Sequence, residues 1–462
     1  MSLSFADPSA PSLPLHVVDK AALTAWRQTL PGPAQAWLTG AGFAAGLGEI
    51  CLLPSAEGAL AGAVIGHGDA AARARGRFWL AKAADALPAG AWHIEANLPA
   101  EDLEEAALGW LLAAYRFGRY RATAPAPAAM LKAPEGVDAA RLEIIANAEA
   151  LTRDLVNTPA SDLGPEQLEA AFADLAACFN ADMTVIRGDE LLAQNLPMIH
   201  AVGRASPRAP RLLDLRWGSE GPRLTLVGKG VCFDTGGLDL KPAAGMGLMK
   251  KDMGGAATVM GLAQMIMGLG LRVRLRVLVP AVENAVAGNA MRPQDILTSR
   301  KGLTVEVNNT DAEGRLILAD ALALADEEAP DCLICMATLT GAARVALGPD
   351  LPPFYTDDEA LAAAITSGAA RARDPLWRMP FWTPYDPLIE PGIADLDNAP
   401  AGGMAGSITA ALFLRRFVTE TPRFVHFDLY GWQPVAAPAR PKGAAAQGAR
   451  ALLAALPEIL DL

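Results

Sequence analysis

The sequence is poor in cysteine, histidine and charged side chains. It has 5 cysteines and 5 histidines in 462 residues, and charged residues make up 19%. Cysteines this sparse, without a disulfide-like spacing, are typical of a reducing compartment. The first residues contain no basic segment followed by an apolar core, and no apolar run approaches the ~18 residues that a membrane helix needs. We therefore expect a cytoplasmic protein with no signal peptide and no membrane partner.

Several common catalytic and binding motifs are also missing. The net charge of −12 and the lack of a basic cluster disfavour nucleic acid as a partner. The chain has no HExxH zinc-protease helix and neither of the glycine-rich phosphate motifs, GxxxxGK(S/T) and GxGxxG. Its one CxxC pair, Cys332 and Cys335, lies in an apolar run that predicts a buried strand, and His426 is predicted to be a core residue. The chemistry must therefore come from other residue types.

Two carboxylates stand close together in the stretch 309–316, whose sequence is NTDAEGRL. If its backbone is extended, the side chains of Asp311 and Glu313 point the same way, because positions i and i+2 of a strand share a face. Two carboxylates at short range repel one another unless a cation lies between them, so a hard metal ion is the natural occupant. The apolar segment that begins at Ile317 predicts a helix and places the motif at a strand-to-helix junction.

A glycine-rich segment after a predicted strand adds more groups of this kind. The strand, 224–227, is followed by Lys229, Asp234, Lys241 and Asp252. Glycines between them let the backbone fold closely around a small site. A lysine that lies among carboxylates and a dication can lose its proton, because the dication disfavours the charged form. Lys229 is therefore a candidate nitrogen ligand, and Lys241 is a candidate cation for stabilising an oxyanion.

Together these motifs resemble those of the leucine aminopeptidase (cytosol aminopeptidase) family of metallopeptidases, peptidase family M17. The family pattern consists of Gly-Lys-Gly, Phe-Asp-Ser-Gly-Gly, Lys-Pro, Asp-Met-Gly-Gly and Asn-Thr-Asp-Ala-Glu-Gly-Arg. All of these occur here in the same order, with Thr235 in place of the serine. The resemblance extends from Asn157 onward and includes further stretches around Asp395, Gly406 and His426.

The resemblance implies a role for each matching residue. Two divalent metal ions, with manganese and zinc as the first candidates, would be held by five ligands, of which Asp234 and Glu313 resemble the bridging carboxylates. Lys241 resembles the residue that contacts the substrate carbonyl oxygen, and Arg315 resembles the arginine that holds a bicarbonate ion. The five ligand positions are Lys229, Asp234, Asp252, Asp311 and Glu313.

The implied activity is metal-dependent hydrolysis of the N-terminal peptide bond of peptides by a metal-bridging water. Metal ions lower the pKa of such a water to about 7 in the best zinc cases and polarise the scissile carbonyl. Met249 and Thr338 match positions that line the family's pocket for the first side chain, and methionine is adaptable, so leucine-like residues are the expected preference. Family members form hexamers, so a homohexamer is expected here.

Two alternative functions stay open at this point. One is a narrow dipeptidase, for example one that acts on Cys-Gly, and hydrolysis of tripeptides and longer peptides would distinguish it. The other is a non-catalytic or DNA-binding member of the family, which the acidic balance of the chain disfavours.

The chain divides into two predicted α/β domains. The stretch 122–134 holds three prolines and six alanines and predicts an extended linker. Residues 1–134, including this linker, form a small N-terminal α/β domain, and residues 135–462 form the catalytic domain. There, strand and helix patterns alternate, which predicts a mostly parallel sheet flanked by helices. The expected strands are 184–186, 211–216, 224–227, 271–279, 332–337 and 424–429, and the expected helices are 190–195, 256–269, 317–328, 361–373 and 407–418.

Two polar patterns give further expectations. Asp320, Asp326, Glu327 and Glu328 are predicted to be solvated charges on the helix 317–328. Residues 271–277 alternate between leucine or valine and arginine, so this strand is expected to have one wet face or to lie at a sheet edge.

Overall fold

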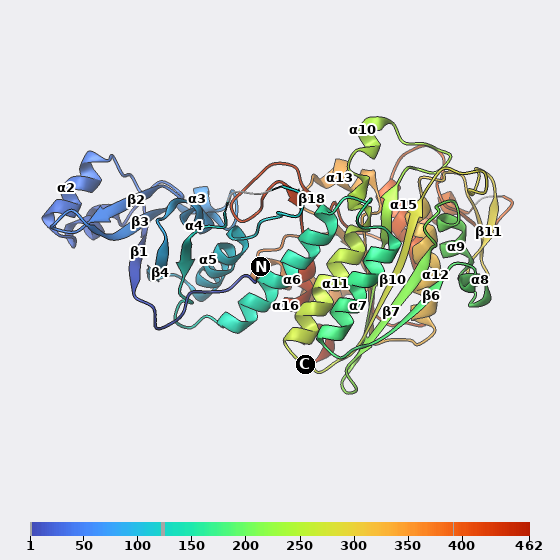
Figure 1. Ribbon diagram of the computed structural model, residues 1–462. Coiled ribbons are helices and arrows are strands. Elements are labelled where there is room, and N and C mark those ends of the chain that lie inside the picture. The colour runs from blue at the N-terminus through green and yellow to red at the C-terminus, as the bar shows by residue number, and fades with distance from the viewer. Residues whose placement is uncertain (1, 122–124, 391) are drawn as a thin grey trace. The chain divides into compact units, whose positions relative to one another are not determined.

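The structure, a computed structural model, describes residues 2–121, 125–390 and 392–462 (Figure 1). It contains two compact units, and the C-terminal part of the chain returns briefly to the first of them. The first unit consists of Met1–Ala150 and Val435–Lys442, and the second consists of Leu151–Pro434 and Gly443–Leu462.

The first unit is built on a five-stranded sheet with the strand order β2-β3-β1-β4-β5. Its strands pair in parallel except for β2 and β3, which are antiparallel. Within the stretch 122–134, residues 122–124 lie outside the described residues, whereas Ala129–Leu131 forms strand β5. The strands are β1 (Ser12–Asp19), β2 (Ile50–Pro54), β3 (Leu60–Gly68), β4 (Gly90–Glu95) and β5, and the longest helix confined to this unit is α5 (Ala100–Ala113).

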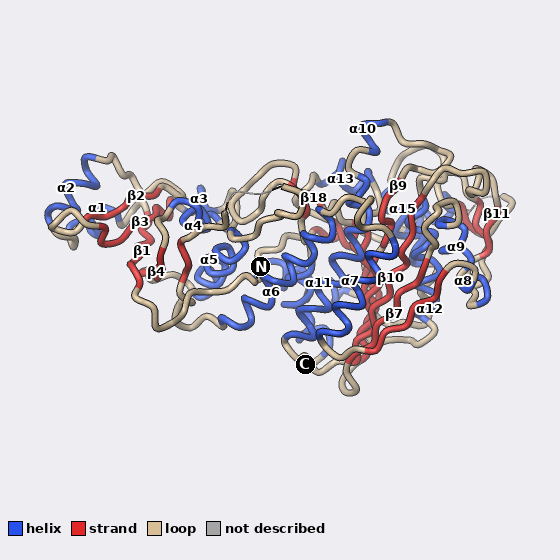
Figure 2. Tube along the Cα trace, viewed as in Figure 1, coloured by secondary structure: helices blue, strands red, loops and turns tan. Residues whose placement is uncertain are grey.

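The second unit contains a larger mixed sheet (Figure 2). The strands at its centre are parallel. Its order is β15-β14-β17-β13-β8-β10-β7-β6, and β9 also pairs with β10. Strands β17, β13, β8 and β10 are parallel neighbours, so Val425, Ile334, Leu226 and Val277 form one continuous row across the sheet. The bounds are β6 (Asp182–Arg187), β7 (Arg211–Trp217), β8 (Arg223–Gly228), β9 (Gly230–Asp234), β10 (Arg274–Asn284), β13 (Cys332–Ala337), β14 (Pro353–Tyr355), β15 (Trp377–Met379) and β17 (Phe424–Asp428).

Helices cover both faces of this sheet (Figure 1). On one face lie α7 (Pro165–Cys178), α11 (Gly254–Gly268) and α16 (Ala449–Leu460), with α14 (Glu359–Arg371) against α16. The other face is covered by α9 (Pro197–Gly203), α12 (Glu313–Asp326) and α15 (Gly406–Arg415). The remaining elements of the unit are short, and the predicted α/β architecture with a mostly parallel sheet is confirmed.

Apolar runs explain why the central strands are buried on both sides. Every residue of β13 is buried, including Cys332 and Cys335, which are free cysteines. The strand predicted at 271–279 was expected to have a wet face or an edge position. Arg272 and Arg274 are exposed at its start, but the edge position is wrong and the wet face ends before Arg276. The observed strand β10 lies between β8 and β7, and Arg276 is buried there because it pairs with Asp214 at 2.7 Å. A paired arginine can occupy a central strand that an unpaired one cannot.

The parallel strands bring several polar residues to one edge of the sheet. Lys229 directly follows β8, Asp234 is the last residue of β9, Thr338 follows β13, and Asp428 ends β17. Open α/β sheets place their ligand sites beyond the carboxyl ends of such strands. No helix among the described residues combines the length and apolar character that a bilayer crossing requires.

Candidate metal centre

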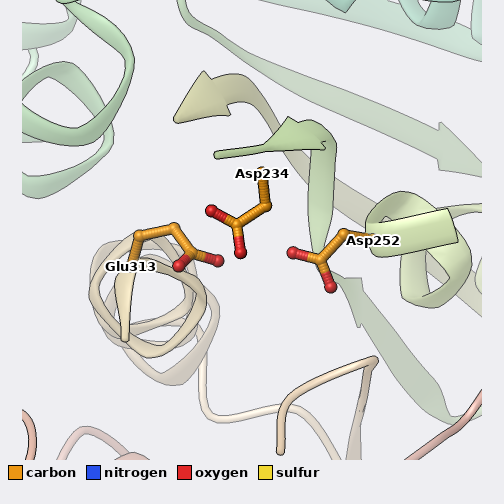
Figure 3. Close-up of side chains that lie close together, drawn as sticks. All are labelled: Asp234, Asp252 and Glu313. Atoms are coloured by element: carbon orange, nitrogen blue, oxygen red, sulfur yellow. The ribbon is translucent and has the colours of Figure 1, made fainter. Parts of the chain in front are cut away.

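Three buried carboxylates from separate elements converge at this edge (Figure 3). Asp234 ends β9, Asp252 lies in the short 3-10 helix η2 (Met249–Met253), and Glu313 is the first residue of α12. One oxygen from each lies within 4.8 Å of the others. Buried carboxylates at this range are costly unless cations accompany them. The oxygen-rich donor set therefore fits a hard or borderline divalent cation.

Two lysines reach into the same group of carboxylates. The Lys229 ammonium lies 2.6 Å from Asp252 Oδ2 and 3.0 Å from Glu313 Oε1, and it donates to the Thr338 carbonyl oxygen at 3.0 Å. The Lys241 ammonium lies 2.8 Å from Asp234 Oδ2 and 2.5 Å from an oxygen of Asp311. Four acidic residues and two lysines thus form one charge network.

Burial and mutual repulsion perturb the carboxyl groups. Burial, followed by the charge of Asp234, raises the pKa of Glu313 to about 8, and the same two causes raise the pKa of Asp311 to about 6. Burial alone would lower the pKa of Lys229, but the carboxylates around it outweigh that effect and raise the pKa. The neutral amine expected of Lys229 as a ligand therefore needs a bound dication to displace its proton.

The local backbone differs from the one expected for Asp311 and Glu313. The two residues do not lie on an extended strand: Asp311 is in a turn, and Glu313 already begins α12. The Asp311 amide donates to Asn309 Oδ1 at 2.8 Å, an interaction with which asparagine stabilises turns in place of strands. The two carboxylates still reach the same network, but Asp311 lies outside the group of three and meets it through Lys241.

Glycines allow the charged side chains to approach the backbone so closely. A Cβ atom on Gly314 would lie 2.3 Å from Lys229 Cε, and a Cβ atom on Gly255 would lie 2.1 Å from the Met336 carbonyl oxygen. The first glycine gives Lys229 its space beside α12, and the second lets α11 pack directly on β13. Larger residues at these positions are therefore incompatible with the observed site.

A cavity of about 690 Å³ opens beside the carboxylates. Arg315 lines it, and its Nε is buried and has no hydrogen-bond partner in the part of the chain that the structure describes. Burial lowers the pKa of Arg315 to about 10, which leaves it charged at neutral pH. The predicted pocket residues Met249 and Thr338 also line this cavity, and Thr338 donates its hydroxyl to Asp252 at 2.9 Å.

The cavity wall also includes residues that the sequence interpretation did not single out. Lys251, Arg344 and Tyr430 all line it. Lys251 stands between Lys250 and Asp252, but the sequence does not reveal which of the two lysines faces the cavity. Burial lowers the pKa of Lys251 to about 8. No motif marked Arg344, which lies in α13 (Gly341–Leu347) and reaches the site only through the fold.

Two predictions about polar residues outside the site had different outcomes. Asp320 and Asp326 were predicted to be solvated, and this is wrong: both are buried and accept backbone hydrogen bonds, whereas Glu327 and Glu328 are exposed. His426 is a core residue as predicted, and burial lowers its pKa to about 3, so its ring is neutral.

Comparison with known proteins identifies two family domains in the chain. The cytosol aminopeptidase family, catalytic domain, matches residues 150–453, and the M17 aminopeptidase, N-terminal domain, matches residues 13–134. The chain belongs to the cytosol aminopeptidase family. Its relatives include a probable cytosol aminopeptidase of Syntrophotalea carbinolica, which is 42% identical over 75% of this chain and 73% of the relative.

Two solved structures resemble this chain over nearly its whole length. The crystal structure of a cytosol aminopeptidase from Coxiella burnetii is 41% identical, covers 99% of each chain and gives a TM-score of 0.94. The bottromycin maturation enzyme BotP in complex with Mn is 32% identical, covers 97% of this chain and 99% of its own, and gives a TM-score of 0.87. The fold of this chain is thus that of a metal-dependent aminopeptidase family.

Proposed function

We propose that this protein is an aminopeptidase that hydrolyses the N-terminal peptide bond of peptides with two divalent metal ions. The observation that carries the proposal is the convergence of Asp234, Asp252 and Glu313 within 4.8 Å beside a cavity. Membership of the cytosol aminopeptidase family supports the reaction class.

In this proposal five residues hold the metal ions, and manganese and zinc are the first candidates. The Mn bound to a structural relative supports manganese. Bound divalent ions would supply Lewis acidity and lower the pKa of a water that bridges them. The remaining work falls to the chain itself: it excludes bulk water from the buried carboxylates and fixes their positions through η2 and α12. The ligands are Lys229, Asp234, Asp252, Asp311 and Glu313.

Two cationic residues take catalytic roles beside the ligands. The ammonium of Lys241 donates a hydrogen bond to the oxyanion that forms at the scissile carbonyl, and its position between Asp234 and Asp311 keeps it charged. Arg315 holds a bicarbonate ion, for which its buried Nε offers a free donor. No histidine lines the cavity among the described residues, so a bound anion is the group suited to carrying the proton to the leaving amine.

The side chain of the first residue is proposed to lie against Met249 and Thr338, which suits leucine-like residues. The site is proposed to act in the cytoplasm, in a homohexamer. A narrow dipeptidase is the second candidate, and assays with tripeptides and longer peptides separate the two: cleavage of a tripeptide excludes the dipeptidase.

The experiment that tests the proposal is removal of metal from the purified protein. We expect chelation to abolish hydrolysis of leucine p-nitroanilide, and re-addition of Mn²⁺ or Zn²⁺ to restore it. Light scattering on the same sample tests for a particle of six chains. Hydrolysis that survives exhaustive chelation would refute the metal mechanism.

The ligand assignment is tested by Asp252→Ala and Glu313→Ala. Each removes one of the converging carboxylates, so activity should fall by at least about a hundredfold while the circular dichroism spectrum stays that of the folded chain. Asp174→Ala, which removes an exposed aspartate of α7, is the matched control and should retain activity. Normal turnover in both ligand variants would show the assignment to be wrong.

A further inference from the structure

Two cations in the cavity wall have no carboxylate partner. Of the lysines that line the cavity, Lys229 and Lys241 pair with the carboxylates of the metal centre. Lys251 and Arg344 line the same cavity, and neither forms an ion pair with any carboxylate of the described residues. An anion that enters the cavity therefore meets two positive charges that form no ion pair, although the charges of Asp252 and Asp428 act on Lys251 from a longer distance.

The ring of Tyr430 holds these two cations close to one another. Lys251 Nζ lies 4.9 Å from the ring centroid, and Arg344 Cζ lies 5.3 Å from it. Lys251 is only 7% exposed, and a buried ammonium without a counter-ion is unfavourable. Cation–π contacts offset only part of that cost and leave the ammonium able to donate hydrogen bonds. A carboxylate group of a bound molecule would supply the counter-ion that the two cations lack.

The position of the pair relates it to the first residue of a substrate. Lys251 lies in η2 between Met249, which lines the cavity, and Asp252, which belongs to the metal centre. Arg344 lies in α13, which begins just after Thr338, and the side chain of Arg344 is exposed at the cavity. The methylene groups of the substrate's first side chain can therefore lie along Met249, while the terminal group of that side chain reaches the two cations.

We propose that the pocket for the first side chain binds a carboxylate, so that the protein removes N-terminal glutamate and aspartate. This inference rests on the proposed aminopeptidase function and extends the expected preference for leucine-like residues. Met249 contacts the methylene groups, and Lys251 and Arg344 bind the charged end. The C-terminal carboxylate of a dipeptide carries the same chemistry, so the experiment separates the two sources.

The test compares kcat/KM for the coumarin amides of glutamate, glutamine and leucine, which have no C-terminal carboxylate. Charge-assisted hydrogen bonds should favour glutamate over its uncharged isostere glutamine by about tenfold or more. Equal values for glutamate and glutamine, together with a preference for Leu-Gly over Leu-Gly amide, would assign the cations to the peptide C-terminus and overturn the inference.

A binding measurement keeps this inference separate from the proposed function. Calorimetric titration of the metal-loaded protein with free glutamate and free glutamine needs no turnover. Glutamate that binds about tenfold more tightly than glutamine supports the pocket, even if no amide is cleaved. A lack of cleavage would count against the proposed function alone. Equal binding of the two amino acids overturns the pocket even if leucine amide is hydrolysed.

Variants locate the effect in the two cations. Arg344→Gln, at an exposed position that should not disturb folding, and Lys251→Met should each bring the glutamate-to-glutamine ratio of kcat/KM close to one. Lys250→Met is the matched control, because Lys250 is the neighbouring lysine but is not part of the cavity wall, and the ratio should stay as in the unmodified protein. An unchanged ratio in Arg344→Gln would overturn the assignment.

Discussion

At the scale of single residues, Gly314 determines whether Lys229 can enter the metal centre. A Cβ atom at this position would lie 2.3 Å from Lys229 Cε and 2.7 Å from its Nζ. The lysine side chain is held by ion pairs with Asp252 and Glu313, so moving it away from a new Cβ atom would disrupt these pairs. Glycine within a helix costs about 1 kcal/mol of stability relative to alanine. At position 314 this cost is accompanied by the space that the Lys229 side chain needs.

We predict that Gly314→Ala weakens metal binding and activity by about 10- to 100-fold, although alanine favours the helix itself. Titration with Mn²⁺, followed by an activity assay at saturating metal, measures both effects. Gly288→Ala is the control, because no atom lies within 4 Å of a Cβ built at Gly288. If Gly314→Ala binds metal as tightly as the unmodified protein, the steric argument is wrong.

At the scale of elements, α12 links the metal centre to a distant loop. The helix begins with Glu313 and ends with Asp326. Midway along it, Asp320 Oδ2 accepts a hydrogen bond from the Met198 amide at 2.7 Å, near the start of α9. Asp326 accepts the backbone N–H groups of Thr419, Glu420 and Thr421 at 2.7–3.1 Å. The acidic residues of α12 thus connect the helix to other parts of the fold at its start, middle and end.

The hydrogen bonds to Asp326 predict a pH-dependent stabilisation. Burial raises the pKa of Asp326, but the backbone donors outweigh it and lower the pKa below the ordinary value of 3.8. The carboxylate therefore stabilises the fold above that pH, and the stabilisation is lost as the pH falls through the lower pKa of the folded state. Asp326→Asn should reduce the free energy of unfolding by about 1–3 kcal/mol at pH 7, because an amide nitrogen would face backbone donors.

Denaturant unfolding at pH 7 and at pH 3 measures this effect. The difference in the free energy of unfolding between Asp326→Asn and the unmodified protein should be smaller at pH 3 than at pH 7. Glu327→Gln changes the exposed neighbour, which forms only a surface pair with Arg300, and should cost less than about 1 kcal/mol. A difference for Asp326→Asn that is equal at the two pH values would contradict the assignment.

At the scale of the whole molecule, the candidate metal centre forms only in the folded chain. Its residues follow β8, end β9, lie in η2 and begin α12, so the unfolded chain does not bring them together. A ligand that binds only the folded state stabilises it by about 2.7 kcal/mol at a hundred times its dissociation constant.

We therefore predict that Mn²⁺ raises the midpoint of thermal unfolding by a few degrees in the unmodified protein. The rise should be absent in a variant that combines Asp252→Ala and Glu313→Ala, and differential scanning fluorimetry measures both without reference to activity. An equal rise in the double variant would place the stabilising metal elsewhere.

The sequence predicted the architecture well where apolar periodicity determines it. The buried runs of β8 and β13 and the helix that became α12 were recognised because burial on both faces leaves an unbroken apolar pattern. Prediction of burial from the sequence failed for charged residues whose partners are distant along the chain. Arg276 lies in a central strand because Asp214 pairs with it, and Asp326 is buried because a loop near residue 420 supplies its donors.

The same distinction applies to the metal centre. The motifs singled out four acidic residues, and three of them, Asp234, Asp252 and Glu313, converge in the structure. An extended backbone was the wrong local structure for Asp311 and Glu313. The cationic part of the cavity was missed because Lys251 and Arg344 are 93 positions apart and meet only at Tyr430. Proximity of this kind is a property of the tertiary fold.

The attachment of α12 has a practical consequence for anyone who modifies the protein. A helix of 14 residues spans about 20 Å, so the loop at 419–421 lies far from Glu313. The loop nevertheless holds the last residue of the helix that begins with Glu313. We therefore expect that trimming or tagging this loop would remove hydrogen bonds that hold the end of α12, so it is a poor place to immobilise the protein or to fuse it to another.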